Sequence, residues 1–261
     1  MGQQSSGDPL SAISCSSRVA FFGGTFDPPH LGHLGVARAA QAALYLDTVL
    51  FAPVGTQPLK PQGPTACFED RLAMTRLAIA TEPAFALSLA DAPKSTGAPN
   101  YTLETLLALR AHLPPESALF CLMGTDSFAG FSRWHRAAEI PFVAPLIVAS
   151  RPGELMDGID SALLDGLTME AVPEGYSSEH FPLIPALSKA TIELRRYILR
   201  NPAGDQSPFY LLPGLQIDIS ASQIRDQIHN QTQPSTAAQT LQPALLPAPV
   251  LEYIRAHGLY R

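Results

Sequence analysis

The sequence predicts an α/β fold in which helices cover both faces of an open parallel sheet. Short apolar runs such as Val19–Phe22, Thr48–Pro53 and Ala118–Met123 have no polar face, as expected of strands buried on both sides. Segments with helical spacing stand between such runs, for example Leu34–Leu46, so neighbouring strands are expected to be parallel with right-handed crossovers. Sheets of this kind bind ligands at the carboxyl ends of their strands, so the site is expected there.

The segment Val19–His33 has the most informative order of residues. Its strand is followed by Gly23–Gly24, where the backbone is expected to turn and to offer N–H groups to a ligand. Asp27–Pro29 cannot continue the strand, and a proline is well placed to open a helix. His30 and His33 then share one helix face near its N-terminus. Unpaired N–H groups, the positive end of the helix dipole and two imidazoles together indicate a polyphosphate site.

Each of these features has a plainer interpretation when it is taken alone. A glycine pair after a strand is often an ordinary turn, and a single histidine is often a surface or core residue. The two histidines could also bind a metal ion, but no third ligand stands at a usual zinc spacing. The polyphosphate interpretation therefore depends on the whole string of residues.

That string, GGTFDPPHLGH at residues 23–33, closely resembles a family signature. It matches the glycine turn and HxGH core of the nucleotidyltransferase superfamily, in the form GGTFDPxHxGH found in bacterial nicotinate-nucleotide adenylyltransferases. The resemblance implies a Rossmann-like nucleotidyltransferase fold that transfers the adenylyl group of ATP to nicotinate mononucleotide, giving deamido-NAD and pyrophosphate. It implies that His30 and His33 are catalytic contacts to the ATP phosphates and that Asp27 binds the nicotinate nucleotide. The ATP-binding residues implied by the same string are Gly23, Gly24, Thr25 and Phe26.

A second segment with the chemistry of a phosphate site is Ile217–Arg225. Ile217–Ile219 is predicted to be a short strand, and Ser220 is a good N-cap for the helix that follows. The plain interpretation is a capped surface helix with a solvated Arg225 on its exposed side. The segment resembles the family's ISxTxxR element, with Ser222 in place of the usual threonine. The resemblance implies that Ser220 and Ser222 bind ATP and that Arg225, counted as catalytic, holds the β- and γ-phosphates.

Lys60 stands in a loop, Val54–Ala66, that proline and glycine interrupt. Such a lysine is usually solvated, but the resemblance favours a mobile cation that closes over the ATP phosphates. The family typically has a Pro-Pro-His-Lys/Arg run here. This sequence has Gln57–Lys60, which keeps the cation and places Leu59 where the histidine would stand.

Gly124–Ser127 follows the predicted strand Ala118–Met123. An ionised aspartate only accepts hydrogen bonds, so Asp126 suits a ribose hydroxyl, or it could simply cap the next helix. The segment matches the family's GxDS element, which implies that Gly124 and Asp126 bind the adenosine of ATP.

Residues at three further places in the sequence are assigned to the nicotinate nucleotide. Thr102 is predicted to be the N-cap of the helix TLETLLALRAHL, and alone this is an ordinary cap. Trp134 is the only tryptophan, and such a residue is most often packed in the core. The resemblance places Tyr101 and Thr102 at the nicotinate end and Trp134 beside the pyridine ring. Arg151 begins an Arg-Pro-Gly turn that also matches the family and is assigned to the same substrate.

Shifts in composition predict the domain organisation. Residues 1–17 have neither the positive charge nor the apolar run of a secretory signal, so they are predicted to be a disordered extension. Residues 18–261 are predicted to form a single nucleotidyltransferase domain. Within it, residues 154–212 match the family poorly and are predicted to be an insertion, and the polar segment 229–242 is predicted to be a flexible loop.

The remaining elements are predicted from local patterns. Glu69–Ala80 is expected to be an amphipathic helix with Arg71 on its charged face, and Ile192–Leu199 is expected to be helical. Phe85–Leu89 and Phe209–Leu212 are expected to be strands.

Composition limits the classes of partner. Of the 261 residues, 46% are hydrophobic and 15% are charged, below the roughly 25% charged residues of typical globular proteins, so a sizeable core is expected. A net charge of −6 argues against a nucleic-acid surface, so a few local groups must meet an anionic substrate. No run approaches the ~20 apolar residues of a membrane span. Three scattered cysteines make no disulfide framework and fit a cytoplasmic protein, and the sequence leaves a homo-oligomer open.

The resemblance implies Mg²⁺ as the cofactor, bound with ATP mainly through phosphate oxygens and water, and the sequence has no evident carboxylate set for a metal of its own. Three other functions stay open. An adenylyltransferase with another acceptor, nicotinamide mononucleotide or phosphopantetheine, would share both phosphate motifs. A non-catalytic nucleotide sensor would keep the fold, although His30, His33 and Arg225 are all present. A metal-dependent hydrolase would need a carboxylate or histidine cluster that the sequence lacks.

Overall fold

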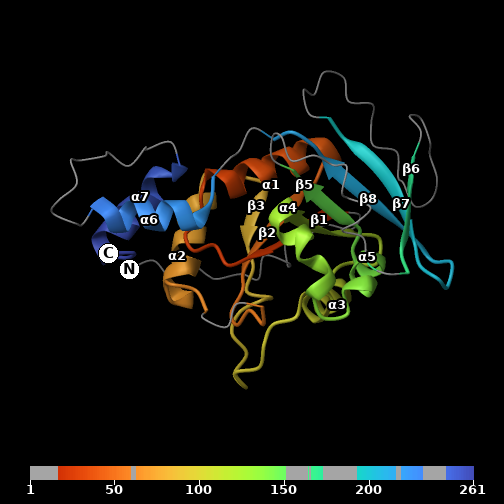
Figure 1. The fold of residues 1–261 in the computed structure, drawn as a ribbon, viewed down its shortest axis with the longest axis horizontal. Coiled ribbons are helices and arrows are strands. Elements are labelled where there is room, and N and C mark those ends of the chain that lie inside the picture. The colour runs from red at the N-terminus through yellow and green to blue at the C-terminus, as the bar shows by residue number, and fades with distance from the viewer. Residues whose placement is uncertain are drawn as a thin grey trace.

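The fold is built on one sheet, shown in Figure 1, in a computed structural model that describes residues 17–59, 63–150, 164, 166–172, 193–215, 219–231 and 245–261. In this part of the chain the sheet has 8 strands in the order β3-β2-β1-β4-β5-β8-β7-β6. From β3 to β8 the neighbours are parallel, whereas β7 and β6 are antiparallel additions at one edge. The strands are β1 (Arg18–Gly24), β2 (Thr48–Pro53), β3 (Phe85–Leu87), β4 (Ala118–Gly124), β5 (Leu146–Ala149), β6 (Thr168–Ala171), β7 (Arg195–Arg200) and β8 (Gln206–Leu212).

Helices cover both faces of this sheet, as predicted. One face packs against α1, α2, α6 and α7, and the other packs against α3, α4 and α5 (Figure 1). Within the described ranges, no helix is both long and apolar enough to cross a membrane. The helices are α1 (Leu31–Leu44), α2 (Phe68–Ile79), α3 (Thr102–His112), α4 (Thr125–Ala129), α5 (Ile140–Val143), α6 (Ala221–Gln231) and α7 (Ala248–His257).

The central strands are buried on both faces. In β1, Ala20 and Phe22 pack into the core beneath α1, whereas Val19 and Phe21 pack into the core beneath α3. All four side chains are at most 5% exposed. Because successive strand residues point to opposite faces, this two-sided burial explains why the whole run is apolar.

The path of the chain changes direction across the sheet between β1 and β4. From β1 the chain proceeds outward to β2 and β3, and it then returns to form β4 on the other side of β1. At such a switch point the loops after two adjacent strands diverge and leave a crevice at the carboxyl ends. Gly24 ends β1 and Gly124 ends β4, so the signature string at residues 23–33 and the Gly124–Ser127 segment meet at this crevice.

The prediction of a helix at Ile192–Leu199 is wrong over the residues that the structure describes. Arg195–Arg200 is β7, which pairs antiparallel with β8 on one side and with β6 on the other. Ile198 and Leu199 are buried by the sheet contacts. Aromatic and β-branched residues such as Tyr197 and Ile198 favour strands when a partner strand is present, and β8 supplies one directly after a short hairpin turn.

Some predicted boundaries also differ. β8 pairs in parallel with β5, so the range predicted as an insertion supplies one strand of the parallel part of the sheet. Residues 229–231 were predicted to begin a flexible loop, but they form the last turn of α6. Residues 1–16, 232–242 and the predicted strand residues 217–218 lie outside the described residues.

Candidate active site

A cavity of about 790 Å³ opens at the carboxyl ends of β1 and β4. It is lined by every predicted site residue that the structure describes, and these residues come from five separate segments of the chain. They are Gly23, Gly24, Thr25, Phe26, Asp27, His30, His33, Tyr101, Thr102, Gly124, Asp126, Trp134, Ser220, Ser222 and Arg225. The other two, Lys60 and Arg151, lie outside the described residues.

The glycine pair acts differently from the prediction. Gly23 and Gly24 do not turn the chain but extend β1, opposite Ala52 and Pro53 of β2. A Cβ atom at Gly23 would lie 2.8 Å from the Phe21 ring, and a Cβ atom at Gly24 would lie 3.1 Å from the Phe26 ring. The two glycines therefore leave room for aromatic rings that pack close to the backbone. The turn itself follows them, with Phe26 in a left-handed conformation at φ 48°.

The two histidines lie at the start of α1, as predicted. His30 is the N-cap residue and is buried, whereas His33 lies one turn later and is half-buried. Their rings are 3.7 Å apart between centroids, and the His33 ring also packs edge-on against Phe26 at 4.9 Å. The backbone N–H of His30 donates a hydrogen bond of 3.2 Å to Nδ1 of His33. Because Nδ1 is the acceptor, the neutral His33 ring carries its hydrogen on Nε2.

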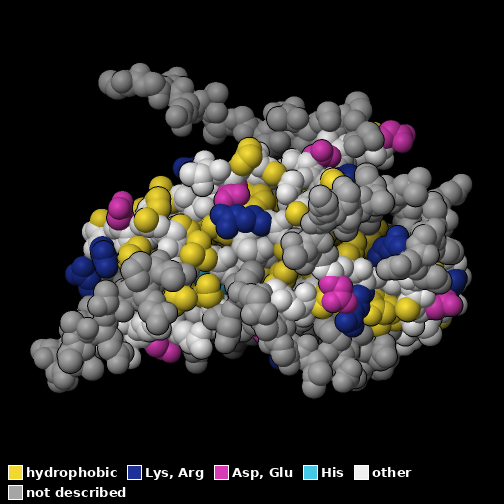
Figure 2. All heavy atoms as spheres, turned by 90° about the horizontal axis from the view of Figure 1, so that it is seen from above, with side chains coloured by type: hydrophobic (Ala, Val, Ile, Leu, Met, Phe, Trp, Pro, Cys, Tyr) yellow, Lys and Arg dark blue, Asp and Glu magenta, His cyan; other side chains and the backbone are white. Residues whose placement is uncertain are grey.

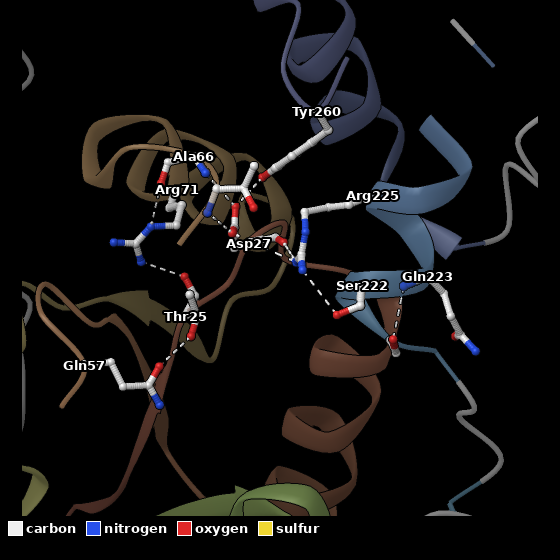
Figure 3. A network of polar contacts seen from close by, with 11 residues as sticks. Thr25, Asp27, Gln57, Ala66, Arg71, Ser222, Gln223, Arg225 and Tyr260 are labelled. Atoms are coloured by element: carbon white, nitrogen blue, oxygen red, sulfur yellow. Dashed lines mark hydrogen bonds and ion pairs between the residues drawn. The ribbon is translucent and has the colours of Figure 1, made fainter. Parts of the chain in front are cut away.

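Asp27 is a structural junction. Its carboxylate is buried and accepts hydrogen bonds from the backbone N–H groups of Thr65 at 2.7 Å and Ala66 at 3.1 Å. The hydroxyl of Tyr260 donates a third hydrogen bond, at 2.8 Å (Figure 3). The carboxylate thus connects the signature turn, the loop before α2 and the segment after α7, and its assignment to the nicotinate nucleotide stays a prediction.

Arg225 approaches Asp27 from α6. Its guanidinium donates to the backbone carbonyl of Asp27 at 2.7 Å and to the Ser222 hydroxyl at 3.2 Å (Figure 3). The Asp27 carboxylate is farther away, at 4.0 Å. Ser220 caps the helix, because its side-chain oxygen accepts from the Gln223 N–H at 3.2 Å, as predicted. Arg225 is half-buried at the edge of the cavity and is not a freely solvated side chain.

Arg71 supports the site from α2, and the sequence pattern predicted the wrong position for its side chain. It was predicted on the charged face of α2, but only 1% of its surface is exposed. The guanidinium donates to three backbone carbonyls, those of Thr25 at 2.7 Å, Val54 at 2.9 Å and Ala66 at 3.3 Å. Burial lowers the pKa of Arg71, and the Asp27 charge opposes this shift. The signal for its position was its spacing from the buried residues Met74 and Ala78.

The residues predicted to bind the nicotinate end lie at the start of α3 and after α4. Tyr101 is the N-cap of α3 and Thr102 its first residue, so the prediction of Thr102 as the cap is wrong by one position. The Tyr101 ring packs against the His135 ring at 4.4 Å. Trp134 packs edge-on against the buried Phe131 at 5.4 Å and also lines the cavity, and its place beside the pyridine ring stays a prediction. His135 lines the same cavity and was not predicted.

A buried polar cluster supports this end of the cavity. The Asp91 carboxylate accepts a hydrogen bond of 2.8 Å from the Thr105 hydroxyl of α3. Asn100 accepts from the Thr56 N–H at 2.9 Å and donates to the Ala92 carbonyl at 3.0 Å. Burial raises the pKa of Asp91, although the Thr105 hydrogen bond opposes this shift. The cluster ties the loop after β2 to the start of α3.

At the end of β4, Gly124 is the N-cap of α4 and Asp126 is exposed in its first turn. Cys121, in β4, also lines the cavity. Burial raises the pKa of its thiol to about 12, so the thiol is neutral and is no candidate nucleophile.

Charged side chains of both signs are mixed on the described part of one face of the molecule (Figure 2). On the face drawn in Figure 2, Lys and Arg side chains stand apart from one another, among apolar and acidic side chains. The described part of this face therefore has no broad positive patch that would attract an anion (Figure 2).

The family model and the curated relatives that match this chain indicate the same family. The chain matches the family model described as cytidylyltransferase-like over residues 21–227. A probable nicotinate-nucleotide adenylyltransferase of Dechloromonas aromatica (strain RCB) is 35% identical over 246 residues, which cover 94% of this chain and 99% of that protein. A protein of the same description from Sodalis glossinidius (strain morsitans) is 35% identical over 249 residues, covering 93% and 97%.

Solved structures agree at the level of the fold. Plasmodium falciparum nicotinic acid mononucleotide adenylyltransferase complexed with NaAD has a TM-score of 0.60 at 14% identity, covering 94% of this chain and 97% of that one. The same enzyme complexed with APC has a TM-score of 0.59. The family model and the near full-length relatives above 30% identity decide membership: the chain belongs to the cytidylyltransferase-like family and, within it, to the nicotinate-nucleotide adenylyltransferases.

Proposed function

We propose that the protein transfers the adenylyl group of ATP to nicotinate mononucleotide, producing nicotinate adenine dinucleotide and pyrophosphate. The observation that carries the proposal is the meeting of two helix N-termini, those of α1 and α6, at one cavity. Helix N-termini bind phosphate through their unpaired N–H groups and positive dipole end. The description of the relatives as probable nicotinate-nucleotide adenylyltransferases supports the same reaction.

The reaction needs alignment more than acid–base chemistry. The 5′-phosphate oxygen of nicotinate mononucleotide forms a bond to the α-phosphorus of ATP, and the bond from that phosphorus to the pyrophosphate oxygen breaks. The attacking phosphate is already an anion at pH 7, so no general base is required. Orientation of two bound reactants can supply roughly 7–11 kcal/mol of the barrier. The remaining requirement is to stabilise negative charge as pyrophosphate leaves.

His33 and Arg225 are proposed to stabilise that negative charge. Because the His30 N–H donates to Nδ1 of His33, the ring hydrogen of His33 is on Nε2, and this N–H is assigned to the α-phosphate. Arg225 has a planar, permanently charged donor set and is assigned to the β- and γ-phosphates. His30 and Lys60 are assigned as further phosphate contacts, and Gly124 and Asp126 are assigned to the adenosine.

Mg²⁺ is proposed to arrive with ATP as part of the substrate. Among the residues that the structure describes, no group of three or more His, Cys, Asp or Glu side chains could hold a metal ion. The Asp27 carboxylate is occupied by two amides and a tyrosine hydroxyl. This donor set fits an ion held by phosphate oxygens and water, which is how Mg²⁺ usually binds in nucleotide sites.

A pyrophosphate-release assay with MgATP tests the proposal. Nicotinate mononucleotide, nicotinamide mononucleotide and phosphopantetheine are compared as acceptors at equal concentrations. We expect the nicotinate form to be strongly preferred. A preference for either other acceptor would keep the phosphate chemistry but contradict the assignment of Tyr101, Thr102 and Trp134. The absence of pyrophosphate with all three would leave a nucleotide-binding sensor as the better account.

A further inference from the structure

The chain segment after α7 reaches back into the signature turn through Tyr260. This residue is 233 positions from Asp27, yet its hydroxyl lies 2.8 Å from Oδ1 of that aspartate. In Figure 3, Tyr260 and Arg225 approach Asp27 from different elements. Tyr260 is only 8% exposed and its backbone is left-handed, with φ 64°. A bulky residue rarely adopts this conformation unless the surrounding contacts fix it.

The hydroxyl of Tyr260 is a permanent donor. Burial raises the pKa of Tyr260 far above the ordinary tyrosine range, and the charge of Asp27 raises it further. The phenol therefore stays protonated at every pH at which the protein works. It holds Oδ1 of Asp27 while the Thr65 N–H holds Oδ2, at 2.7 Å.

These contacts set how Asp27 meets Arg225. Arg225 donates to the Asp27 backbone carbonyl at 2.7 Å, while its distance from the carboxylate oxygen Oδ2 is 4.0 Å. A free carboxylate beside a guanidinium would form a shorter, two-pronged ion pair. With Tyr260 and the two amides in place, the carboxylate is turned away from that pairing, and the guanidinium keeps donors for another anion.

We propose that Tyr260 is a positioning residue for the phosphate-binding site, acting through the Asp27 carboxylate to keep Arg225 available for the substrate phosphates. This rests on the proposed function, in which Arg225 holds the β- and γ-phosphates of ATP. Without the hydroxyl, Asp27 pairs with Arg225 and competes with the phosphates for the same donors.

The chain contains a matched control in Tyr253. Its hydroxyl also donates to an aspartate, Oδ1 of Asp70, at 2.9 Å. That bond joins α7 to α2, and neither residue lines the cavity. Tyr260→Phe and Tyr253→Phe therefore remove the same type of hydrogen bond, one at the site and one outside it.

The test measures kcat and KM for ATP at saturating nicotinate mononucleotide, and the binding of a non-hydrolysable ATP analogue by calorimetry. We expect Tyr260→Phe to weaken analogue binding and to raise KM for ATP by about 10-fold, the size of effect expected when about one hydrogen bond to a charged group is lost. KM for nicotinate mononucleotide should change much less. Tyr253→Phe should match the wild type in all three constants, and thermal unfolding should show that both variants are folded.

A third variant separates positioning from simple loss of packing. If Tyr260 acts through Asp27, the double variant Asp27→Asn/Tyr260→Phe should bind the ATP analogue no more weakly than Asp27→Asn alone. Additive losses would overturn the proposal, as would equal ATP constants for Tyr260→Phe and Tyr253→Phe. If the wild type binds the analogue but transfers the adenylyl group to no acceptor, only the proposed function is contradicted. The proposal for Tyr260 is then tested by the analogue affinities of Tyr260→Phe and Tyr253→Phe.

Discussion

Two histidines in the first turn of α1 have unequal surroundings. His30 is buried as the N-cap residue, and His33 is half-buried with its ring between the rings of His30 and Phe26. The His30 N–H fixes the tautomer of His33, so the hydrogen of its neutral ring is on Nε2. His33 is therefore the better placed of the two to follow the charge that develops at the α-phosphate.

Replacement of His33 should affect turnover more than binding. We expect His33→Ala to lower kcat by about 10²–10³, as for other donors that act on a developing charge, and to change ATP-analogue binding much less. Steady-state kinetics and calorimetry check this. His112→Ala, on the exposed part of α3, is the control. Equal losses in kcat and in binding would contradict the assignment.

Arg225 should act mainly on ATP affinity. Hydrogen bonds to charged groups contribute about 1.5–3 kcal/mol, so Arg225→Ala should weaken ATP binding roughly 10- to 150-fold while the fold is retained. Arg225→Lys should recover only part of this loss, because lysine cannot reproduce the planar donor set. Arg76→Ala, an exposed arginine of α2, is the control. Wild-type ATP constants in Arg225→Ala would remove it from the phosphate site.

At the scale of elements, α2 supports the site from behind through Arg71. This one side chain satisfies three backbone carbonyls, of which Thr25 and Val54 follow β1 and β2 directly. Arg71→Met keeps the aliphatic volume but leaves those carbonyls without their donor. We expect the free energy of unfolding to fall by about 3 kcal/mol, measured in urea. Arg76→Met, one turn later and exposed, should stay within about 0.5 kcal/mol of the wild type; a similar small change for Arg71→Met would contradict the account.

Asp91 gives the α3 end of the site a pH-dependent stability. Its pKa is raised in the folded state by burial, above the usual value near 4. The folded state therefore holds this proton more tightly than the unfolded state. Its contribution to stability is complete below about pH 4 and is lost as the pH rises through the raised value. Asp91→Asn removes the titration, so its stability relative to wild type should increase with pH in urea unfolding from pH 3.5 to 7; a constant difference would contradict this.

The elements that could be predicted from the sequence are those buried on both faces. β1, β2 and β4 appear as uninterrupted apolar runs because no face of them meets water. β7 was mispredicted as a helix because its conformation is decided by its pairing with β6 and with β8, which follows it in a hairpin, and the residues of β7 taken alone do not show that pairing. Arg71 was predicted on the wrong face because its charge was taken as a sign of exposure. In the structure its guanidinium is buried and donates hydrogen bonds to three backbone carbonyls.

At the scale of the whole molecule, the switch point between β1 and β4 gathers segments that are far apart in sequence. Arg225 contacts Asp27 across 198 positions, and Tyr260 does so across 233. The first convergence could be predicted, because both segments carry family motifs and both begin helices. The junction at Asp27 could not be predicted, since its partners are two backbone amides and the hydroxyl of Tyr260, to which the sequence assigned no role.

The central claim is that the bond broken in ATP lies between the α-phosphorus and pyrophosphate. It is tested most directly by one reaction with nicotinate mononucleotide and ATP labelled with ³²P at either the α- or the γ-position. The account predicts that α-label appears in nicotinate adenine dinucleotide and γ-label in pyrophosphate. Transfer of γ-label to the acceptor, or its release as orthophosphate without dinucleotide, would contradict the account.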